Sequence, residues 1–186
     1  DRTAVNRGDV LALPGSLKSS YMLDIQFHYL SSNARKIKNR TQVRFHSGTS
    51  EIMGNLILLD REELKPGESV VGQIRLDTPV TLVKDDRFVI RSYSPVRTIG
   101  GGQVLNPIPV KHKRFRDEIV DGLQGLAESE PGEVIGFHVK QAGYAGSLFS
   151  DLKLMTNLPE KQLQNTVANL LADKTLTQVD KENRRY

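Results

Sequence analysis

Apolar and polar residues alternate in short runs through most of the first 110 positions. Leu23, Ile25, Phe27 and Tyr29 stand at every second position, which places their side chains on one face of a β-strand. Further runs of β character follow at residues 43–45, 52–59, 70–76, 88–90 and 99–105. Turn signals such as Pro66-Gly67 separate the runs. The pattern predicts about six strands in an antiparallel barrel or sandwich.

The periodicity changes to that of helices after residues 107–109. Apolar residues from Phe115 to Leu126 recur at helical spacing and predict a first helix, which Pro131-Gly132 would end. The remaining elements are predicted as a helix at 147–155, a helix that Asn157 can cap, and a strand at 176–179. Three helices followed by strand, turn and strand are the layout of a winged-helix domain, whose third helix usually recognises nucleic acid.

These patterns predict a multi-domain β plus α protein. Residues 1–15 have the character of the end of a preceding β element, and residues 16–110 form the barrel. Residues 111–186 form the winged-helix domain, which stops within its wing, and the basic segment 111–114 is the expected linker. We therefore expect the chain to be a piece of a longer protein.

The charge of the chain is unevenly distributed. Residues 1–110 hold fifteen Lys/Arg against eleven Asp/Glu, whereas residues 111–186 hold eleven of each. The excess positive charge of the first part is compatible with a partner that carries phosphates. The absence of cysteine excludes disulfides and thiolate metal sites, and it fits a cytoplasmic location. No apolar run approaches the length of a membrane helix, so no membrane partner is expected.

A run of three glycines is the first candidate for chemistry. Gly100, Gly101 and Gly102 follow Thr98-Ile99, and glycine lets a backbone approach another molecule closely and expose its N–H groups. The run lacks the Gly-x-x-x-x-Gly-Lys-Ser/Thr pattern of a phosphate loop. The structural alternative is a kinked or bulged strand.

A basic segment is the second candidate. Arg35, Lys36, Lys38 and Arg40, with Arg44 just beyond them, could contact several phosphates, or they could form a solvated loop. Among the histidines, His46 lies at the end of a strand, where it could meet a ligand, whereas no pair has the spacing of a zinc site. Adjacent carboxylates at 62–63 and 85–86 fall in predicted turns, so we assign no catalytic residue.

Four segments of the barrel region form a recognisable set: Arg44–Glu51, Leu64–Glu68, Asp86–Arg91 and Ser94–Gly102. Together they resemble the third domain of the selenocysteine-specific elongation factors, which are relatives of elongation factor Tu. The most specific part is the strand beginning at Arg87 followed by Arg-Thr-Ile-Gly-Gly-Gly. By the same resemblance, residues 1–15 look like the end of the family's second domain and the helical part like the first winged helix of its C-terminal extension.

The resemblance implies a role in delivering selenocysteinyl-tRNA to the ribosome. In the family, the third domain contacts the acceptor-T arm of the tRNA. Carried over to this chain, Arg97, Thr98 and Gly100–Gly102 would line the tRNA side, with His46 and Arg91 nearby. The resemblance places GTP and magnesium in a missing domain upstream and recognition of the selenoprotein mRNA hairpin in missing modules downstream. No cofactor and no enzymatic activity are therefore expected of these residues.

Other functions remain open at this stage. One is a DNA-binding winged-helix regulator whose barrel senses a ligand, but the third predicted helix begins Glu160-Lys161-Gln162 and is nearly neutral. A second is an enzyme that uses the glycine run for a nucleotide, and a third is a purely structural interaction module. The neutral helical domain is expected to act as a spacer toward the modules that bind the mRNA hairpin.

Overall fold

The computed structural model describes residues 4–186, which divide into two compact units. The barrel unit extends to Gln124, and the helical unit comprises Gly125–Tyr186. Among the described residues, no helix is both long enough and apolar enough to cross a membrane.

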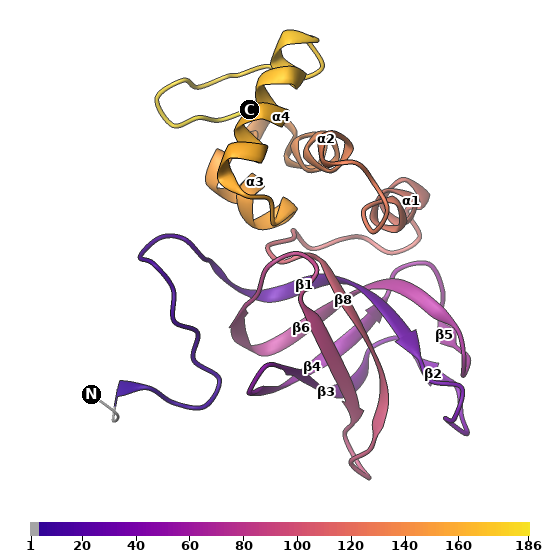
Figure 1. The fold of residues 1–186 in the computed structure, drawn as a ribbon. Helices are drawn as coiled ribbons and strands as arrows, with labels where there is room; N and C mark the ends of the chain where they lie inside the picture. The colour runs from indigo at the N-terminus through magenta and orange to yellow at the C-terminus, as the bar shows by residue number, and fades with distance from the viewer. Residues whose placement is uncertain (1–3) are drawn as a thin grey trace. The chain divides into compact units, whose positions relative to one another are not determined.

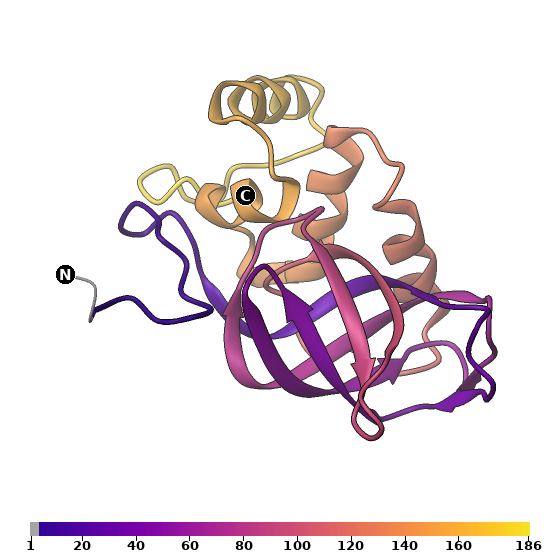
Figure 2. The same ribbon diagram turned by 60° about the horizontal axis from the view of Figure 1, so that its bottom comes forward.

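Six strands of the barrel unit close into an antiparallel barrel in the order β1-β6-β4-β3-β7-β8 (Figures 1 and 2). They are β1 (Ser19–Tyr29), β3 (Thr41–Ser47), β4 (Ser50–Leu58), β6 (Ser69–Thr81), β7 (Arg87–Ser92) and β8 (Thr98–Asn106). The first and last strands pair with each other, so the sheet has no free edge. The predicted six-stranded antiparallel barrel is confirmed.

A second, two-stranded sheet lies beside the barrel. It consists of β2 (Ile37–Lys38) and β5 (Glu63–Leu64), which pair in antiparallel fashion. The basic segment predicted as a loop therefore contains a short strand.

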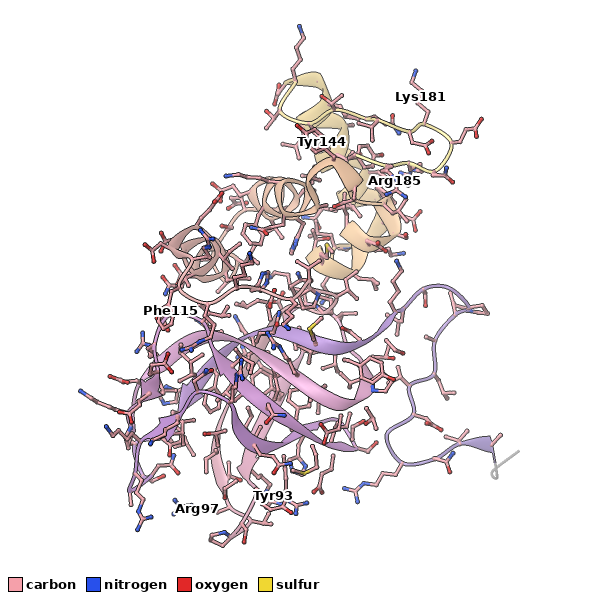
Figure 3. The ribbon with its side chains drawn as sticks, turned by 180° about the vertical axis from the view of Figure 1, so that it is seen from behind. Tyr93, Arg97, Phe115, Tyr144, Lys181 and Arg185 are labelled. Atoms are coloured by element: carbon pink, nitrogen blue, oxygen red, sulfur yellow. The ribbon has the colours of Figure 1, made fainter. Side chains whose placement is uncertain are left out.

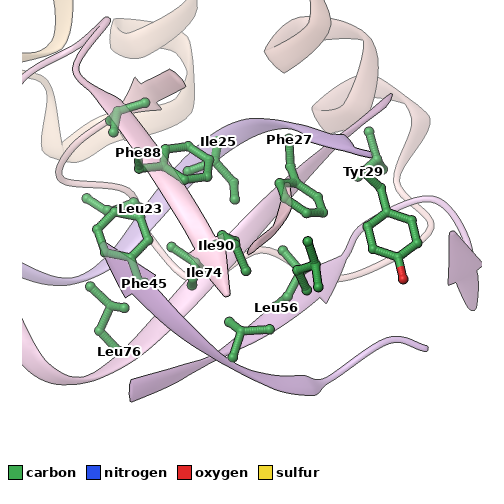
Figure 4. Close-up of a cluster of buried hydrophobic side chains, with 14 of the residues drawn as sticks. Leu23, Ile25, Phe27, Tyr29, Phe45, Leu56, Ile74, Leu76, Phe88 and Ile90 are labelled. Atoms are coloured by element: carbon green, nitrogen blue, oxygen red, sulfur yellow. The ribbon is translucent and has the colours of Figure 1, made fainter. Parts of the chain in front are cut away.

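The barrel interior is filled by the alternate side chains that the sequence pattern marked. Leu23, Ile25, Phe27 and Tyr29 of β1 are almost completely buried, and Figure 4 shows them within the hydrophobic cluster. The rings of Phe45 and Phe88 stack with their centroids 5.2 Å apart. Burial of each large side chain contributes roughly 1.5–3 kcal/mol, so this layer provides the main stabilisation of the barrel unit.

The segment after β8 is strapped to the barrel by buried hydrogen bonds. His112 Nε2 lies 2.8 Å from a carboxylate oxygen of Asp24, and both side chains are buried. Gln73 donates both to Asp24 (3.0 Å) and to the carbonyl of Val110 (2.9 Å). Arg114 donates to the carbonyl of Leu58 at 2.7 Å. The predicted linker is thus a fixed part of the barrel unit up to this point.

Residues 4–15 form no strand in this structure; residues 1–3 lie outside the described part, and the assignment of 1–15 to the end of a preceding β element stays a prediction. An isolated extended segment requires a neighbouring strand to satisfy its backbone groups. Here Arg7 and Gly8 instead hydrogen-bond to Thr49 at the β3–β4 turn.

The helical region contains four α-helices and one short 3₁₀ helix: α1 (Asp117–Gly125), α2 (Pro131–Ala142), η2 (Gly143–Ala145), α3 (Phe149–Thr156) and α4 (Glu160–Ala172). The prediction of a single helix ended by Pro131 was wrong, because Pro131 begins α2. Proline suits the first turn of a helix, where its missing N–H is not needed. Glu130 and Glu133 form a capping box there. Asn157 adopts the left-handed conformation at the end of α3 instead of capping α4.

Three short extended segments of the helical unit, at residues 147–148, 180 and 185–186, pair with one another. Ser147 and Tyr186 exchange two backbone hydrogen bonds of 2.8 and 3.0 Å. Leu148 and Asp180 each form a bridge with Arg185, which therefore lies between them. Beneath these segments, Ile135 of α2, residues of α3 and α4, and Tyr186 form a hydrophobic core of the helical unit.

Candidate nucleic-acid interface

Two of the predicted contact regions meet at Tyr29, at one end of the barrel. The Tyr29 hydroxyl donates a hydrogen bond of 2.7 Å to the carbonyl oxygen of Arg35. Burial raises the pKa of Tyr29, and the charge of Arg97 opposes that rise. Asn33 completes the junction by donating to the carbonyl of Ile99 at 2.8 Å. The exposed cations of the basic segment and of the β7–β8 hairpin therefore share this end of the barrel.

The rest of the basic segment is partly neutralised. Lys36 forms an ion pair with Glu63 of β5, and the Lys36 ammonium and the charge of Lys38 lower the pKa of that carboxyl. Arg40, at a positive φ of 63°, approaches Arg75 on β6 and contributes to the lowered pKa of that guanidinium, of which burial is the larger cause. All four cations of the segment are exposed, but the structure divides them among different neighbours.

The outer face of β3 and β7 brings His46 and Arg91 together, as the resemblance implies. Arg44 is paired with Arg91, and His46 with Val89, across the two strands. Arg44 is held by Glu51 at 2.6 Å. The pKa of His46 is lowered, mainly by burial and further by neighbouring arginines including Arg91, although Glu51 opposes the shift. His46 is therefore neutral at pH 7, among guanidinium groups that suit an anion.

The hairpin between β7 and β8 projects from the barrel. Figure 3 shows Tyr93 and Arg97 together at its tip, far from Phe115 on the same unit. Thr98, the first residue of β8, pairs with Arg91. Arg87 and Arg91 alternate with buried residues on β7 and are both exposed, so one face of the strand carries both charges.

The glycine run occupies the middle of a fully paired strand. Gly100, Gly101 and Gly102 each pair with a residue of β1 on one side and of β7 on the other. Backbone N–H groups of a strand flanked on both sides are directed at its neighbours. The expectation that these N–H groups meet phosphate is therefore not supported, and a register shift at Ile90/Arg91 fits the alternative of an irregular strand.

Close packing explains why glycine occupies these positions. A Cβ on Gly102 would lie 1.8 Å from the carbonyl oxygen of Gln26, and one on Gly100 would lie 2.3 Å from that of His28. Gly101 is paired with His28 and Val89, which are both exposed, so it leaves a place without a side chain on the outer surface.

The sequence interpretation missed the roles of two side chains, one at the hairpin tip and one in the segment after β8. Tyr93 is 53% exposed at the hairpin tip. Its position beside Arg44 could not be recognised from the sequence, because it depends on the pairing of β3 with β7. His112 was assigned to a linker, but its partner Asp24 lies 88 residues earlier. Among residues 4–186, no group of three or more His, Asp or Glu side chains is arranged to hold a metal ion.

A hollow of about 620 Å³ lies beside the β3–β4 turn, lined in part by residues 8–11 and 80–83. None of the predicted contact residues lines it.

Comparisons with known proteins agree with the β-barrel described above. Residues 25–111 match the family described as selenocysteine-specific elongation factor, beta-barrel domain. A selenocysteine-specific elongation factor from Desulfomicrobium baculatum is 35% identical over an alignment of 196 residues. That alignment covers 100% of this chain and 31% of the relative. The chain thus spans less than a third of the length of this curated relative.

Proposed function

Because the barrel of this chain belongs to the family of selenocysteine-specific elongation factors, we propose that it serves selenocysteine incorporation by holding the acceptor-T arm of selenocysteinyl-tRNA. A double-stranded RNA arm is recognised mostly through its shape, phosphates and 2′-hydroxyls, which requires positioned cations and no reading of base edges. The proposed contacts are those to which the resemblance points, now grouped around the β7–β8 hairpin.

The observation that carries this proposal is the concentration of exposed arginines at one end of the barrel. Arg91 and Arg97 flank the hairpin, Arg35 lies across Tyr29 from it, and the stretch from Arg87 to Arg116 contains no Asp or Glu. Each neutralised phosphate releases counterions and so makes binding depend on salt. A surface of this kind favours a polyanion over a neutral ligand.

The proposed role of the glycine run in RNA binding is steric. Because Gly101 presents no side chain between exposed His28 and Val89, an RNA backbone can approach the barrel closely there. Gly100 and Gly102 maintain the strand spacing that positions Thr98 and Arg97.

For the helical unit, we propose a winged-helix domain formed by α2, α3 and α4. In support, the bridges place Arg185 between Leu148 and Asp180, which is the order of a small three-stranded wing sheet after helix, strand, helix, helix. The recognition position is then taken by α4, which contains one lysine and one glutamate. A neutral helix is a poor phosphate ligand, so this unit is proposed as a spacer toward modules that bind the mRNA hairpin.

The other activities of the family are assigned to none of these 186 residues. The sequence has no phosphate-loop motif for GTP. Contact with the ribosome and with a selenoprotein mRNA is proposed for the longer proteins to which the chain is similar. A DNA-binding regulator with a ligand-sensing barrel is not favoured, because α4 lacks the basic surface that it would need.

Binding of selenocysteine tRNA across a salt series tests the proposal. We expect affinity to fall linearly with log salt, and Arg97→Ala to reduce that slope by about one unit. Arg116→Ala is the matched control, since Arg116 is also exposed and adjoins Phe115, far from the hairpin (Figure 3). Equal effects of the two substitutions, or the absence of salt-dependent binding, would count against the barrel as the tRNA-holding part.

A further inference from the structure

The tip of the β7–β8 hairpin carries an exposed aromatic ring that the proposed phosphate contacts do not use. Tyr93 is 53% exposed and Val96 is 51% exposed. We propose that Tyr93 is a stacking platform for an unpaired nucleotide of the bound RNA, with the Arg44 guanidinium lying over one face of the ring and the base stacking on the opposite face. This inference rests on the proposed function of the barrel.

The hairpin tip is ordered by its own hydrogen bonds. Ser92 donates its N–H to the carbonyl of Arg97 at 2.9 Å, and the N–H of Arg97 donates to the Ser92 hydroxyl at 3.2 Å. The Ser92 hydroxyl in turn donates to the carbonyl of Pro95. A ring carried by a closed turn loses little conformational freedom when a ligand binds, which favours affinity.

Arg44 contacts the Tyr93 ring and places a positive charge beside it. Its guanidinium carbon lies 5.7 Å from the centroid of the Tyr93 ring, within the range of a cation–π contact. Arg44 is itself anchored by Glu51 at 2.6 Å and is paired with Arg91 on the neighbouring strand. A base that stacks on the ring would therefore bring its own phosphate close to two guanidinium groups.

The chemistry of the surface selects nucleic acid as the occupant. Arg91 and Arg97 flank the ring in sequence, and no acidic residue occurs between Arg87 and Arg116. Aromatic side chains among cations are the usual means by which proteins hold single-stranded nucleotides. An apolar peptide would gain from the ring and from Val96 but would make no use of the exposed guanidinium groups of Arg91 and Arg97.

The ligand must expose the face of a base. Inside a continuous A-form helix both faces of each base are covered by stacking neighbours, so Tyr93 cannot use them. An unpaired nucleotide next to a helical arm offers a free face and, at the same time, the adjacent phosphates that the arginines require. The ring would thus distinguish an arm with such a nucleotide from an arm without one.

Two blunt-ended RNA duplexes, which have no unpaired loop, test this inference with the whole 186-residue chain. One has a continuous helical stem, and the other carries a single bulged 2-aminopurine. The chain contains no tryptophan, so 2-aminopurine fluorescence can be followed without protein background. We expect the bulged RNA to bind about tenfold more tightly, with quenching of the probe, because one base–aromatic stack has about this effect.

Tyr93→Leu should abolish both the preference and the quenching while leaving the salt slope unchanged. Tyr21→Leu is the matched control, since Tyr21 is a comparably exposed tyrosine (58%) on β1. Arg44→Met keeps the length of the side chain and should reduce the preference. An unchanged preference in Tyr93→Leu, or an equal loss in Tyr21→Leu, would overturn the stacking role. If the unaltered chain bound neither RNA in a salt-dependent way, the proposed function itself would be overturned instead.

Discussion

Alanine substitutions in the glycine run should destabilise the barrel in an order set by the approach of neighbouring strands. The added Cβ would lie 1.8 Å from the Gln26 oxygen at Gly102, 2.3 Å from the His28 oxygen at Gly100 and 2.7 Å from the Phe88 oxygen at Gly101. Ordinary carbon–oxygen contacts between strands are about 3.3 Å or longer. The strands would therefore have to separate by about 1.5 Å at Gly102 and by about 0.6 Å at Gly101.

Overpacking of a well-packed interior usually costs about 1–3 kcal/mol. We expect Gly102→Ala to reach or exceed the upper end of that range and Gly101→Ala to remain near the lower end. Because both ladders of β8 would be disturbed at Gly102, the chain should also be the least soluble of the series. Urea denaturation, followed by the circular dichroism of the barrel, measures these free energies of unfolding directly.

Gly136 provides a control with the opposite sign. A Cβ at Gly136, within α2, would meet nothing within 4 Å. Alanine is the better helix former by roughly 0.5–1 kcal/mol, so Gly136→Ala should stabilise the helical unit. If Gly102→Ala were no more destabilising than Gly101→Ala, the steric account of the glycine run would be refuted, and a role in contacting a ligand would have to be reconsidered.

Two further predictions concern titratable groups of the barrel unit. His112→Ala should cost about 3 kcal/mol in urea denaturation, since it leaves the Asp24 carboxyl buried without its main partner. Burial raises the pKa of Asp24 above 3.8, and the hydrogen bond to His112 opposes that rise. The contribution of Asp24 to the free energy of unfolding is therefore full below pH 3.8 and is lost as the pH rises through the raised pKa. In His112→Ala this loss of stability should extend to higher pH. The pKa of His46 is lowered from 6.5, so its contribution is present above pH 6.5 and is lost as pH falls through the lowered value. A pH series of unfolding free energies should therefore be flatter on the acid side for His46→Gln than for the unaltered chain.

The barrel could be predicted from sequence because the large apolar side chains that fill its interior recur at every second position of β1. Leu23, Ile25, Phe27 and Tyr29 all face the interior, and the period of two that this requires is visible without any knowledge of pairing. The cationic residues could be proposed as contacts from their type and family context. Their grouping could not, because it depends on which strand lies beside which, as with Arg44 and Arg91.

Helix α2 was missed for a local reason. Proline was taken as the end of a helix, although it is equally suited to a first turn. The capping box at Glu130 and Glu133 was the signal that could have decided between the two interpretations. Its buried face, which includes Val134, Ile135 and His138, contains a histidine that interrupts the apolar pattern.

The strap after β8 shows most clearly what a linear pattern cannot supply. Lys111–Arg114 reads as a charged linker, yet His112 and Arg114 hydrogen-bond to Asp24 and to the carbonyl of Leu58. These partners are 88 and 56 residues away in sequence, so composition gives no indication of the contacts.

The barrel as a folding unit therefore extends beyond its last strand. A boundary at residue 110 would leave Asp24 buried without the imidazole of His112, which lies within hydrogen-bonding distance of its carboxylate. An uncompensated buried carboxylate is far more destabilising than an exposed one. The same cut would remove Arg114, which donates to the carbonyl of Leu58 and forms an ion pair with Glu62. We infer that the segment through Arg114 is retained in the barrel by these partners, and that the guanidinium of Arg114 stabilises the barrel unit.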